Sequence, residues 1–151
     1  ANTLILDEML YNHLPEKEFD LAYIDPPYNQ HPYGSNYFML NLIPNYKRPD
    51  CEKISRVSGI PKDWNRSSFN RKRDAAESFT NLVSSLRAKY LMVSFNSEGY
   101  ISKNEMINIL EKVGTVTVLD ISYNAFKGSR NLKNRDIYVS EYLFIVKKHK
   151  V

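Results

Sequence analysis

The sequence predicts an α/β fold around a mostly parallel sheet with a final antiparallel strand. Short apolar runs at 19–24, 90–95, 116–123 and 138–146 have the length and composition of strands. Segments with helical spacing separate the first three runs, and this alternation is typical of parallel sheets covered by helices. The last two runs have no helix between them, so we expect these strands to pair as antiparallel neighbours.

The first strand is expected to end in a rigid loop. A helical pattern over Thr3–Leu14, stopped by Pro15, precedes the apolar run Phe19–Ile24. That run passes directly into Asp25-Pro26-Pro27-Tyr28. Two successive prolines exclude a helix and end a central strand, so this loop should be stiff. Ligands of such sheets bind at the carboxyl ends of strands, where this loop and Ser94-Phe95-Asn96 are both expected.

A long connection is expected between the first two strands. It opens with a short helix over Ser35–Ile43, which Pro44 should end. The polar stretch from about 45 to 73 shows no clear period and is treated as an inserted loop. A structureless connection of that length is more often functional than not.

Two longer helices follow. The helix at Asp74–Ala88 should turn one apolar face inward, formed by Phe79, Leu82, Val83 and Leu86. A capping box at Ser102–Glu105 starts the next helix, and Gly114 is expected to end it. The inward residues of that helix should be Met106, Ile107 and Leu110.

Composition limits the class of protein. The chain has 151 residues, of which 42% are hydrophobic and 25% charged, and this suits a single globular domain over 1–151. No apolar run approaches the roughly 18 residues of a membrane span, and no signal-peptide pattern is found. The single Cys51 excludes an intramolecular disulfide and suits a reducing, cytoplasmic location. The three histidines lack metal-ligand spacing, so no metal site is expected.

The net charge of +4 permits an anionic partner, and its distribution is uneven. One cluster lies within nine residues and contains Lys127, Arg130, Lys133 and Arg135. A second cluster contains Arg66, Arg71, Lys72 and Arg73. For charge clusters alone a solvated loop is the favoured interpretation, and a nucleic-acid contact stays open at this point.

The loop after the first strand has the chemistry of an amine-binding pocket. Its prolines remove two backbone donors and leave carbonyl oxygens, beside one carboxylate and one aromatic ring. Asp25 and the Pro26 carbonyl could each accept one N–H of an exocyclic amine while Tyr28 stacks on the base. Drawing those hydrogens out of the ring plane would localise the nitrogen lone pair for attack on an electrophilic methyl group.

Asp25-Pro26-Pro27-Tyr28 resembles the catalytic motif of amino-methyltransferases that act on adenine in DNA. The longer string Leu21–Asn36 resembles the restriction-modification type of these enzymes. Further similar segments are 57–61 with Trp64 and Arg66, then 94–99, 127–131 and 141–144. The resemblance covers most of the chain.

The resemblance implies the second half of a Rossmann-like methyltransferase sheet, with helices on both faces. It implies S-adenosylmethionine as methyl donor and adenine in double-stranded DNA as acceptor, flipped into the pocket. Asp25, Pro26 and Tyr28 would then hold the base, and Pro27 would stiffen the loop. Asp25 would also lie close to the cofactor.

The resemblance also implies contacts around the reacting base. The cluster Lys127–Arg135 would follow the phosphate backbone, with Arg66 and Arg71 as further candidates. Tyr33 and Tyr37 could border the base pocket. A cognate restriction endonuclease is implied as a partner, and no membrane is.

One expected part of such an enzyme is absent from the sequence. These enzymes bind the cofactor with an aromatic-x-Gly-x-Gly loop, where glycine lets the chain approach the ligand. None of the five glycines forms that pattern. We therefore expect a partial catalytic domain that binds the cofactor weakly, is inactive alone and has the missing N-terminal part of the polypeptide as a partner.

Three other functions remain open from the sequence. An amino-methyltransferase of RNA could carry the same motif, because adenine is the same ring in both nucleic acids. Enzymes acting on protein amides usually have Asn at the first motif position, so Asp25 favours a nucleobase. A catalytically inactive nucleic-acid-binding module would use the basic cluster and no cofactor.

Overall fold

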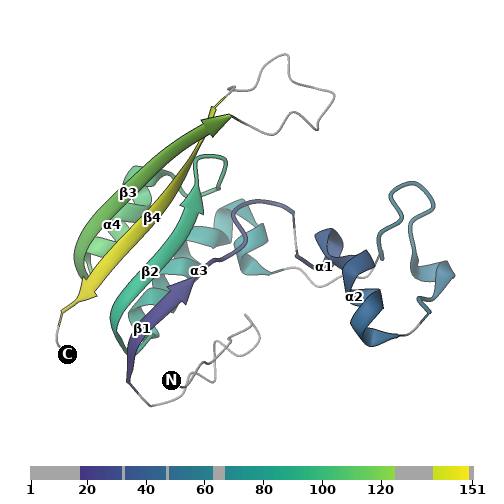
Figure 1. Ribbon diagram of the computed structural model, residues 1–151, viewed down its shortest axis with the longest axis horizontal. Coiled ribbons are helices and arrows are strands. Elements are labelled where there is room, and N and C mark those ends of the chain that lie inside the picture. Colours follow the sequence, from purple (N-terminus) through teal and green to yellow (C-terminus); the bar gives the residue numbers. More distant parts are fainter. Residues whose placement is uncertain (1–17, 32, 47, 63–66, 125–137, 150–151) are drawn as a thin grey trace.

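The computed structural model describes residues 18–31, 33–46, 48–62, 67–124 and 138–149 (Figure 1). Four strands are β1 (Phe19–Ile24), β2 (Ala88–Asn96), β3 (Gly114–Asn124) and β4 (Tyr138–Lys148). Four α-helices are α1 (Tyr33–Asn36), α2 (Phe38–Asn45), α3 (Lys72–Ser85) and α4 (Lys103–Glu111). Two short 3₁₀ turns are η2 (Cys51–Lys53) and η3 (Ser68–Asn70). Among these elements, no helix is long and apolar enough to cross a membrane.

The strands form one sheet in the order β1-β2-β4-β3. β1 and β2 are parallel, whereas β4 is antiparallel to both β2 and β3. β1, β2 and β3 therefore run in one direction, and the last strand runs between β2 and β3 in the other. This confirms the expected sheet and the antiparallel pairing of the last two strands.

The core lies between the sheet and two helices. Strand residues alternate between the two faces, so every second residue of β2 and β4 points toward α3 and α4. The fully buried side chains on this face come from all four elements and are Phe79, Val83, Leu91, Val93, Met106, Leu110, Phe144 and Val146. Of the inward residues expected for the two helices, five are buried, namely Phe79, Val83, Leu86, Met106 and Leu110. Leu82 and Ile107 are only partly buried, and Ile109 is an additional buried residue. The helix expected at Asp74–Ala88 ends at Ser85, and Ala88 is the first residue of β2.

In the described residues, helices cover one face of the sheet. Figure 1 shows α3 and α4 together behind the strands, while α1 and α2 extend away from the sheet. The expected covering of both faces is thus found on one face in this part of the chain. The helix expected at Thr3–Leu14 lies outside the described residues.

The connection between β1 and α3 differs from the expectation. The single helix expected over Ser35–Ile43 is two helices that meet at Tyr37, and Pro44 lies inside α2. A proline in the last turn removes one hydrogen bond but leaves the preceding turns intact. The helix ends at Asn45, and the capping residue Tyr46 adopts the left-handed conformation with φ 49°.

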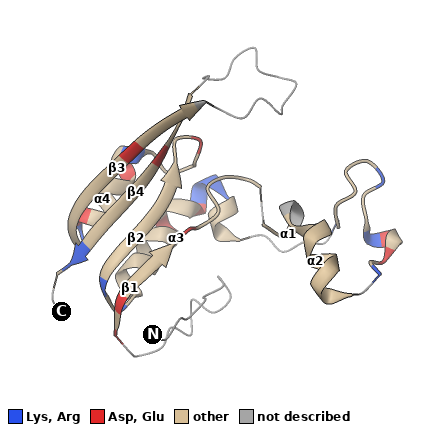
Figure 2. Ribbon diagram, viewed as in Figure 1, with Lys and Arg blue, Asp and Glu red and all other residues tan. Residues whose placement is uncertain are grey.

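The described residues in the rest of the connection are structured. Together with α1 and α2 they form an arm over residues 33–62 (Figure 1). Ile54 and Pro61 pair as an antiparallel bridge, and the Ser55 N–H donates to the Ile60 carbonyl over 2.9 Å. The far end of the arm carries exposed cations (Figure 2), namely Arg48, Lys53, Arg56 and Lys62.

Gly114 has a different role from the one expected. Helix α4 begins as predicted, with the Ser102 hydroxyl accepting a hydrogen bond from the Glu105 N–H over 3.3 Å. It ends at Glu111, and Gly114 is the first residue of β3. A Cβ atom at Gly114 would lie 2.4 Å from the Lys147 carbonyl oxygen, so the close approach of β3 to β4 requires glycine here.

Replacing Gly114 by alanine should destabilise the fold by about 1–3 kcal/mol, because the added methyl group must push two paired backbones apart. Urea denaturation of the 151-residue chain measures this loss. Gly59→Ala is the matched control: open space surrounds Gly59, so only its φ of 67° opposes the change, at a cost of about 1 kcal/mol. An unchanged midpoint for Gly114→Ala would contradict the close approach.

Candidate active site

The loop Asp25–Tyr28 lies beside the end of β2. Because β1 and β2 are parallel and Ile24 pairs with Val93, both carboxyl ends meet at one edge of the sheet. Ser94 is the next residue of β2 and faces the loop. The structure therefore confirms that the Asp-Pro-Pro-Tyr loop and the Ser94-Phe95-Asn96 segment come together.

A hydrogen-bonded network holds the two polar side chains of the loop. The Tyr28 hydroxyl donates to Asp25 Oδ1 over 2.7 Å and lies 3.0 Å from Ser94 Oγ. A phenol has a single proton, and Tyr28 gives it to the carboxylate. The Ser94 hydroxyl must then donate to the Tyr28 oxygen. This arrangement fixes the orientation of the Asp25 carboxylate, and no charged side chain of the described residues pairs with it.

The Tyr28 ring is positioned by packing. Its centroid lies 4.8 Å from that of Phe95, and the two planes are tilted by 55°. Phe95 in turn packs over Gly99, where an added Cβ atom would lie 2.1 Å from a carbon of the Phe95 ring. The small residue after β2 thus sets the position of Phe95, and Phe95 sets the position of Tyr28.

Two more residues anchor the backbone of the loop, and the sequence did not single them out. The Tyr100 N–H donates to the Tyr28 carbonyl over 2.8 Å. The side-chain amide of Asn70, which is buried, donates to the Asn29 carbonyl over 2.8 Å. These contacts join residues far apart in the chain, and no local pattern marks them. Only the polar character of a buried 3₁₀ turn at Ser68–Asn70 could have drawn attention to Asn70.

The two tyrosines nearest Asp25 stay protonated in the folded chain. The pKa of Tyr28 is raised well above its usual value, first by burial and then by its hydrogen bond to Asp25. Burial and the charge of Asp25 raise the pKa of Tyr33 to about 12. Both phenols are therefore neutral hydrogen-bond donors throughout the physiological pH range.

The predicted pocket border lies next to the carboxylate. Asp25, Tyr33, Tyr37 and Asn41 line one open pocket. The Tyr33 hydroxyl donates to the Asp25 carbonyl over 3.2 Å, and the Tyr33 and Tyr37 rings meet edge to face with centroids 5.8 Å apart. Asp25 is exposed, whereas Pro26 is buried and is not one of the residues that line this pocket. The structure thus brings the two tyrosines to the site, while their contact with a base stays a prediction.

The predicted DNA-binding residues are only partly described. Lys127, Arg130, Lys133, Arg135 and Arg66 lie outside the described residues. Arg71 precedes α3, where its Nε lies 2.8 Å from a carboxylate oxygen of Asp74. This ion pair gives Arg71 a position at the start of the helix, and it leaves about half of the side chain exposed.

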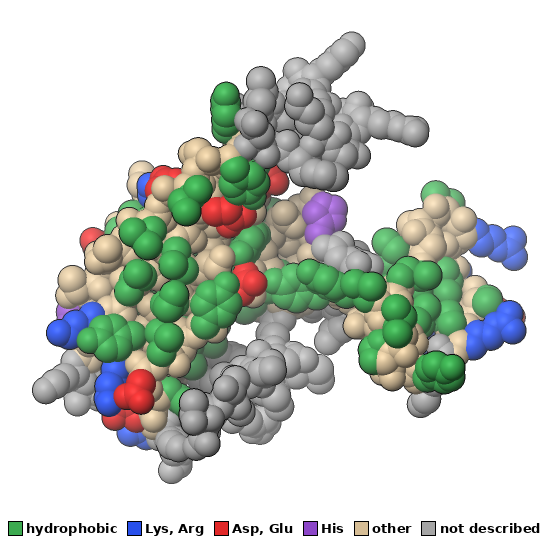
Figure 3. Space-filling view, in the orientation of Figure 1, with side chains coloured by type: hydrophobic (Ala, Val, Ile, Leu, Met, Phe, Trp, Pro, Cys, Tyr) green, Lys and Arg blue, Asp and Glu red, His purple; other side chains and the backbone are tan. Residues whose placement is uncertain are grey.

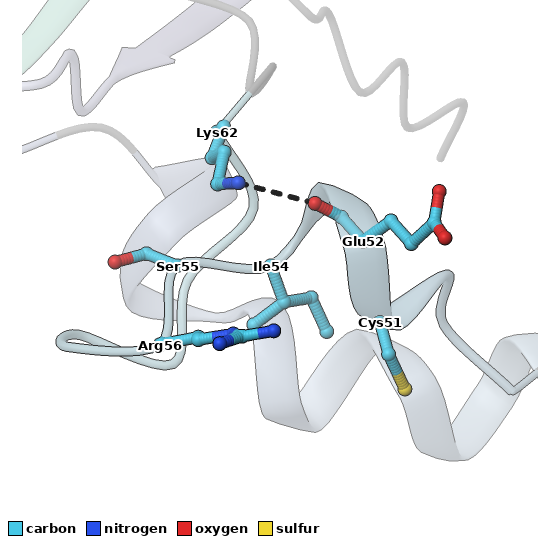
Figure 4. A pocket seen from close by; sticks show the side chains of 6 residues that line it. All are labelled: Cys51, Glu52, Ile54, Ser55, Arg56 and Lys62. Carbon is cyan, nitrogen blue, oxygen red and sulfur yellow. Dashed lines mark hydrogen bonds between the residues drawn. The ribbon is translucent and has the colours of Figure 1, made fainter.

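A second pocket lies in the arm, away from Asp25. Figure 4 shows its six lining residues, Cys51, Glu52, Ile54, Ser55, Arg56 and Lys62. The Lys62 ammonium donates to the Glu52 carbonyl over 3.1 Å and closes the base of the hairpin. The pocket is therefore the inside of a small turn that these contacts stabilise.

Comparison with known proteins decides the family. The sequence profile described as D12 class N6 adenine-specific DNA methyltransferase matches residues 7–109. The chain belongs to this family. The matched range contains the Asp-Pro-Pro-Tyr loop and Ser94, and it ends before the basic cluster at 127–135. The resemblance noted in the motif is therefore confirmed.

Individual relatives are type II methyltransferases. The chain is 38% identical over 127 residues to M.CviAII of Paramecium bursaria Chlorella virus 1, covering 84% of this chain and 37% of the relative. It is 31% identical over 131 residues to M.NlaIII of Neisseria lactamica, covering 85% and 38%. It is 30% identical over 142 residues to M.FokI of Planomicrobium okeanokoites, covering 91% and 21%. The chain thus spans well under half of each relative. No solved structure matches it.

The family uses S-adenosylmethionine, and the described residues do not by themselves fit it. Gly99 packs on Phe95, Gly114 packs on β4, and Gly59 lies in the arm. Gly34 lies within α1. None of these four glycines lies in an open loop beside Asp25 where the methyl donor could come close to the backbone. The expectation of an incomplete donor site stays a prediction.

The link between Ser94 and Tyr28 can be tested through stability. Ser94→Ala should destabilise the chain by about 1 kcal/mol, because the Tyr28 oxygen loses its donor in a partly buried place. In a Tyr28→Phe background the same change should cost little, since the partner is already gone. Urea denaturation of the four proteins gives the coupling. Strictly additive losses would show that the two hydroxyls do not interact.

Proposed function

We propose that this chain is the base-binding part of a DNA adenine N6-methyltransferase of a restriction-modification system. The reaction moves a methyl group from S-adenosylmethionine to the exocyclic amine of a flipped adenine. The observation that carries the proposal is the exposed Asp25 carboxylate, held at the end of β1 by the Tyr28 hydroxyl. The family match and the relatives named as type II methyltransferases support it.

The site can receive an amine without losing hydrogen bonds. An ionised carboxylate accepts several bonds, so Asp25 can take one amine N–H while the Pro26 carbonyl takes the other. If the incoming amine displaces the Tyr28 hydroxyl from Asp25, Ser94 Oγ at 3.0 Å can accept the phenol proton instead. Ser94 therefore gives Tyr28 a second partner, so the phenol proton stays paired after the displacement.

The chain's own residues prepare the nitrogen for reaction. The lone pair of an adenine amine is delocalised into the ring, which makes the amine a poor nucleophile. Two acceptors that hold both hydrogens away from the ring plane localise the lone pair on nitrogen. Tyr28 would stack on the base, and Tyr33 and Tyr37 would border it. Since the described residues do not fit the methyl donor, only the proximity of Asp25 to it is proposed here.

Duplex DNA is the proposed partner outside the pocket. The target base is buried in the stack, so it must be rotated out of the helix to reach Asp25. The cluster of Lys127, Arg130, Lys133 and Arg135 is the proposed phosphate contact, with Arg66 and Arg71 as further candidates. A cognate restriction endonuclease, which would cut the same site when unmethylated, belongs to the same proposal.

The role of Asp25 predicts a loss of reaction without a loss of binding. In the gene product that contains this chain, Asp25→Ala should lower methyl transfer to duplex DNA by about 100-fold or more. DNA affinity, measured by fluorescence anisotropy, should stay within about twofold, because Asp25 contacts the flipped base and not the phosphates. Asp20→Ala is the matched control on the same strand, since that exposed carboxylate pairs only with Lys89 in the described part of the chain. Retained methyl transfer in Asp25→Ala would refute the catalytic assignment.

The basic cluster predicts a change in salt dependence. Each phosphate contact contributes about 0.9 to the slope of log affinity against log salt. Replacing Arg130 and Arg135 by alanine should therefore make the slope shallower by about two units. Lys89→Ala is the control, because Lys89 already pairs with Asp20 over 2.7 Å. An unchanged slope would show that the cluster does not contact DNA phosphates.

A further inference from the structure

Asn70 is the one buried polar residue in the described part of the chain. It lies in the 3₁₀ turn η3, shortly before α3, and only 7% of it is exposed. A buried amide costs free energy unless its polar ends are hydrogen-bonded. An apolar residue at this position would avoid that cost, so the partners of the Asn70 amide indicate what it does.

The two ends of the Asn70 amide have different partners. The Oδ1 atom accepts a hydrogen bond from the Ser67 N–H over 3.3 Å and closes the capping box of η3. The Nδ2 atom donates to the Asn29 carbonyl over 2.8 Å, 41 positions away in the chain. A capping box needs only the acceptor. The turn itself therefore does not require the Nδ2 donor, which binds the backbone beside the Asp-Pro-Pro-Tyr loop.

The segment Asn29–His31 joins the Asp-Pro-Pro-Tyr loop to the arm. Asn70 holds the first residue of this segment, and the Tyr100 hydroxyl donates to the Gln30 side-chain oxygen over 3.1 Å. Figure 3 shows the arm standing apart from the sheet. The place where the arm begins therefore depends on how this segment is held.

The same segment connects the two sides of the pocket. On one side the Tyr28 hydroxyl orients the Asp25 carboxylate. On the other side Tyr33 lines the pocket from the arm. The bond from Asn70 fixes the carbonyl of Asn29, directly after Tyr28, and the chain continues from there to Tyr33. Asn70 thus constrains both sides of the pocket at the point where they join.

We propose that Asn70 is a positioning residue for methyl transfer. Through the Asn29 carbonyl it fixes the place of the Asp25 carboxylate relative to the pocket wall at Tyr33. Asn70 is buried and is not among the residues that line the pocket, so it acts through the loop. A base held slightly out of place still binds but reacts slowly, because reaction requires close alignment of the reacting atoms. This role rests on the proposed function, whereas the hydrogen bond itself does not.

Asn70→Asp separates the two contacts of the side chain. Aspartate keeps an oxygen for the Ser67 N–H, but an ionised carboxylate has no proton to give to the Asn29 carbonyl. In the gene product, single-turnover methyl transfer at saturating DNA and methyl donor should fall by about tenfold or more. DNA affinity, measured by fluorescence anisotropy, should stay within about twofold, because the phosphate contacts are unchanged.

Asn70→Ser gives the same test without a buried charge. The serine hydroxyl is too short to reach the Asn29 carbonyl, so methyl transfer should again fall by about tenfold or more while DNA affinity is kept. An unchanged single-turnover rate in both Asn70 variants would refute the positioning role.

Ser67→Ala is the matched control in the same turn. It removes the hydroxyl that accepts the Phe69 N–H over 3.0 Å and leaves the bond from Asn70 to Asn29 in place. The melting temperature should fall because a cap is lost, but methyl transfer should stay within about twofold. Rates that fall in proportion to melting temperature in Ser67→Ala and the Asn70 variants alike would leave Asn70 with a structural role only.

The hydrogen bond can also be observed directly. Gln30 is the only glutamine of the chain, so ¹⁵N-glutamine and ¹³C-carbonyl asparagine labels give one NMR cross-peak that reports the Asn29 carbonyl. In the 151-residue chain, Asn70→Asp should move this carbonyl resonance upfield, because the oxygen accepts one hydrogen bond fewer. Ser67→Ala should leave the resonance in place. A resonance that does not move in Asn70→Asp would show that the bond is absent in solution and would overturn the proposal.

Failure of this proposal is distinct from failure of the proposed function. Asp25→Ala tests whether the carboxylate is needed for methyl transfer, whatever the Asn70 variants do. An inactive Asp25→Ala protein together with fully active Asn70 variants would refute the positioning role and leave the proposed function standing.

Discussion

The parallel pairing of β1 with β2 is the constraint on which the candidate site depends. It places the loop that follows Ile24 beside Ser94 and Phe95, although about seventy positions separate them in the chain. Without this register, Asp25 would be an exposed carboxylate on a loop with nothing to orient it. With it, the Tyr28 hydroxyl donates to the carboxylate and is itself held by the Ser94 hydroxyl, and among the described residues no cation pairs with Asp25.

Much of the fold and part of the site could be predicted because their signals are local. The apolar run Phe19–Ile24 and the two prolines after it define both the strand and its end. The anchoring of the loop by Asn70 and Tyr100 could not be predicted in the same way. Those contacts depend on how a 3₁₀ turn and the segment after β2 pack against the loop, and an asparagine or tyrosine in isolation carries no sign of it.

The expectations that were wrong concern residues with more than one structural use. Glycine ends helices, but it also permits two backbones to approach closely, and Gly114 serves the second purpose. Proline usually ends a helix, yet Pro44 is tolerated in the final turn of α2. At Gly114 the choice is made by the pairing of β3 with β4, which the local sequence does not encode. At Pro44 it follows from the place of the proline in the last turn, where only one hydrogen bond is lost. The sequence around Ile54 and Pro61 has no periodic pattern and therefore gives no sign that these two residues pair as a bridge.

In the proposed function, the described residues serve one side of a methyl transfer. Asp25 and Pro26 are the proposed acceptors for the amine, and Tyr28 is the proposed aromatic neighbour. The most direct test of this account is the structure of the gene product bound to duplex DNA containing its target adenine. The account predicts the adenine N6 within about 2.7–3.2 Å of both the Asp25 carboxylate and the Pro26 carbonyl oxygen. An amine held by other groups, with Asp25 beyond hydrogen-bonding distance, would contradict it.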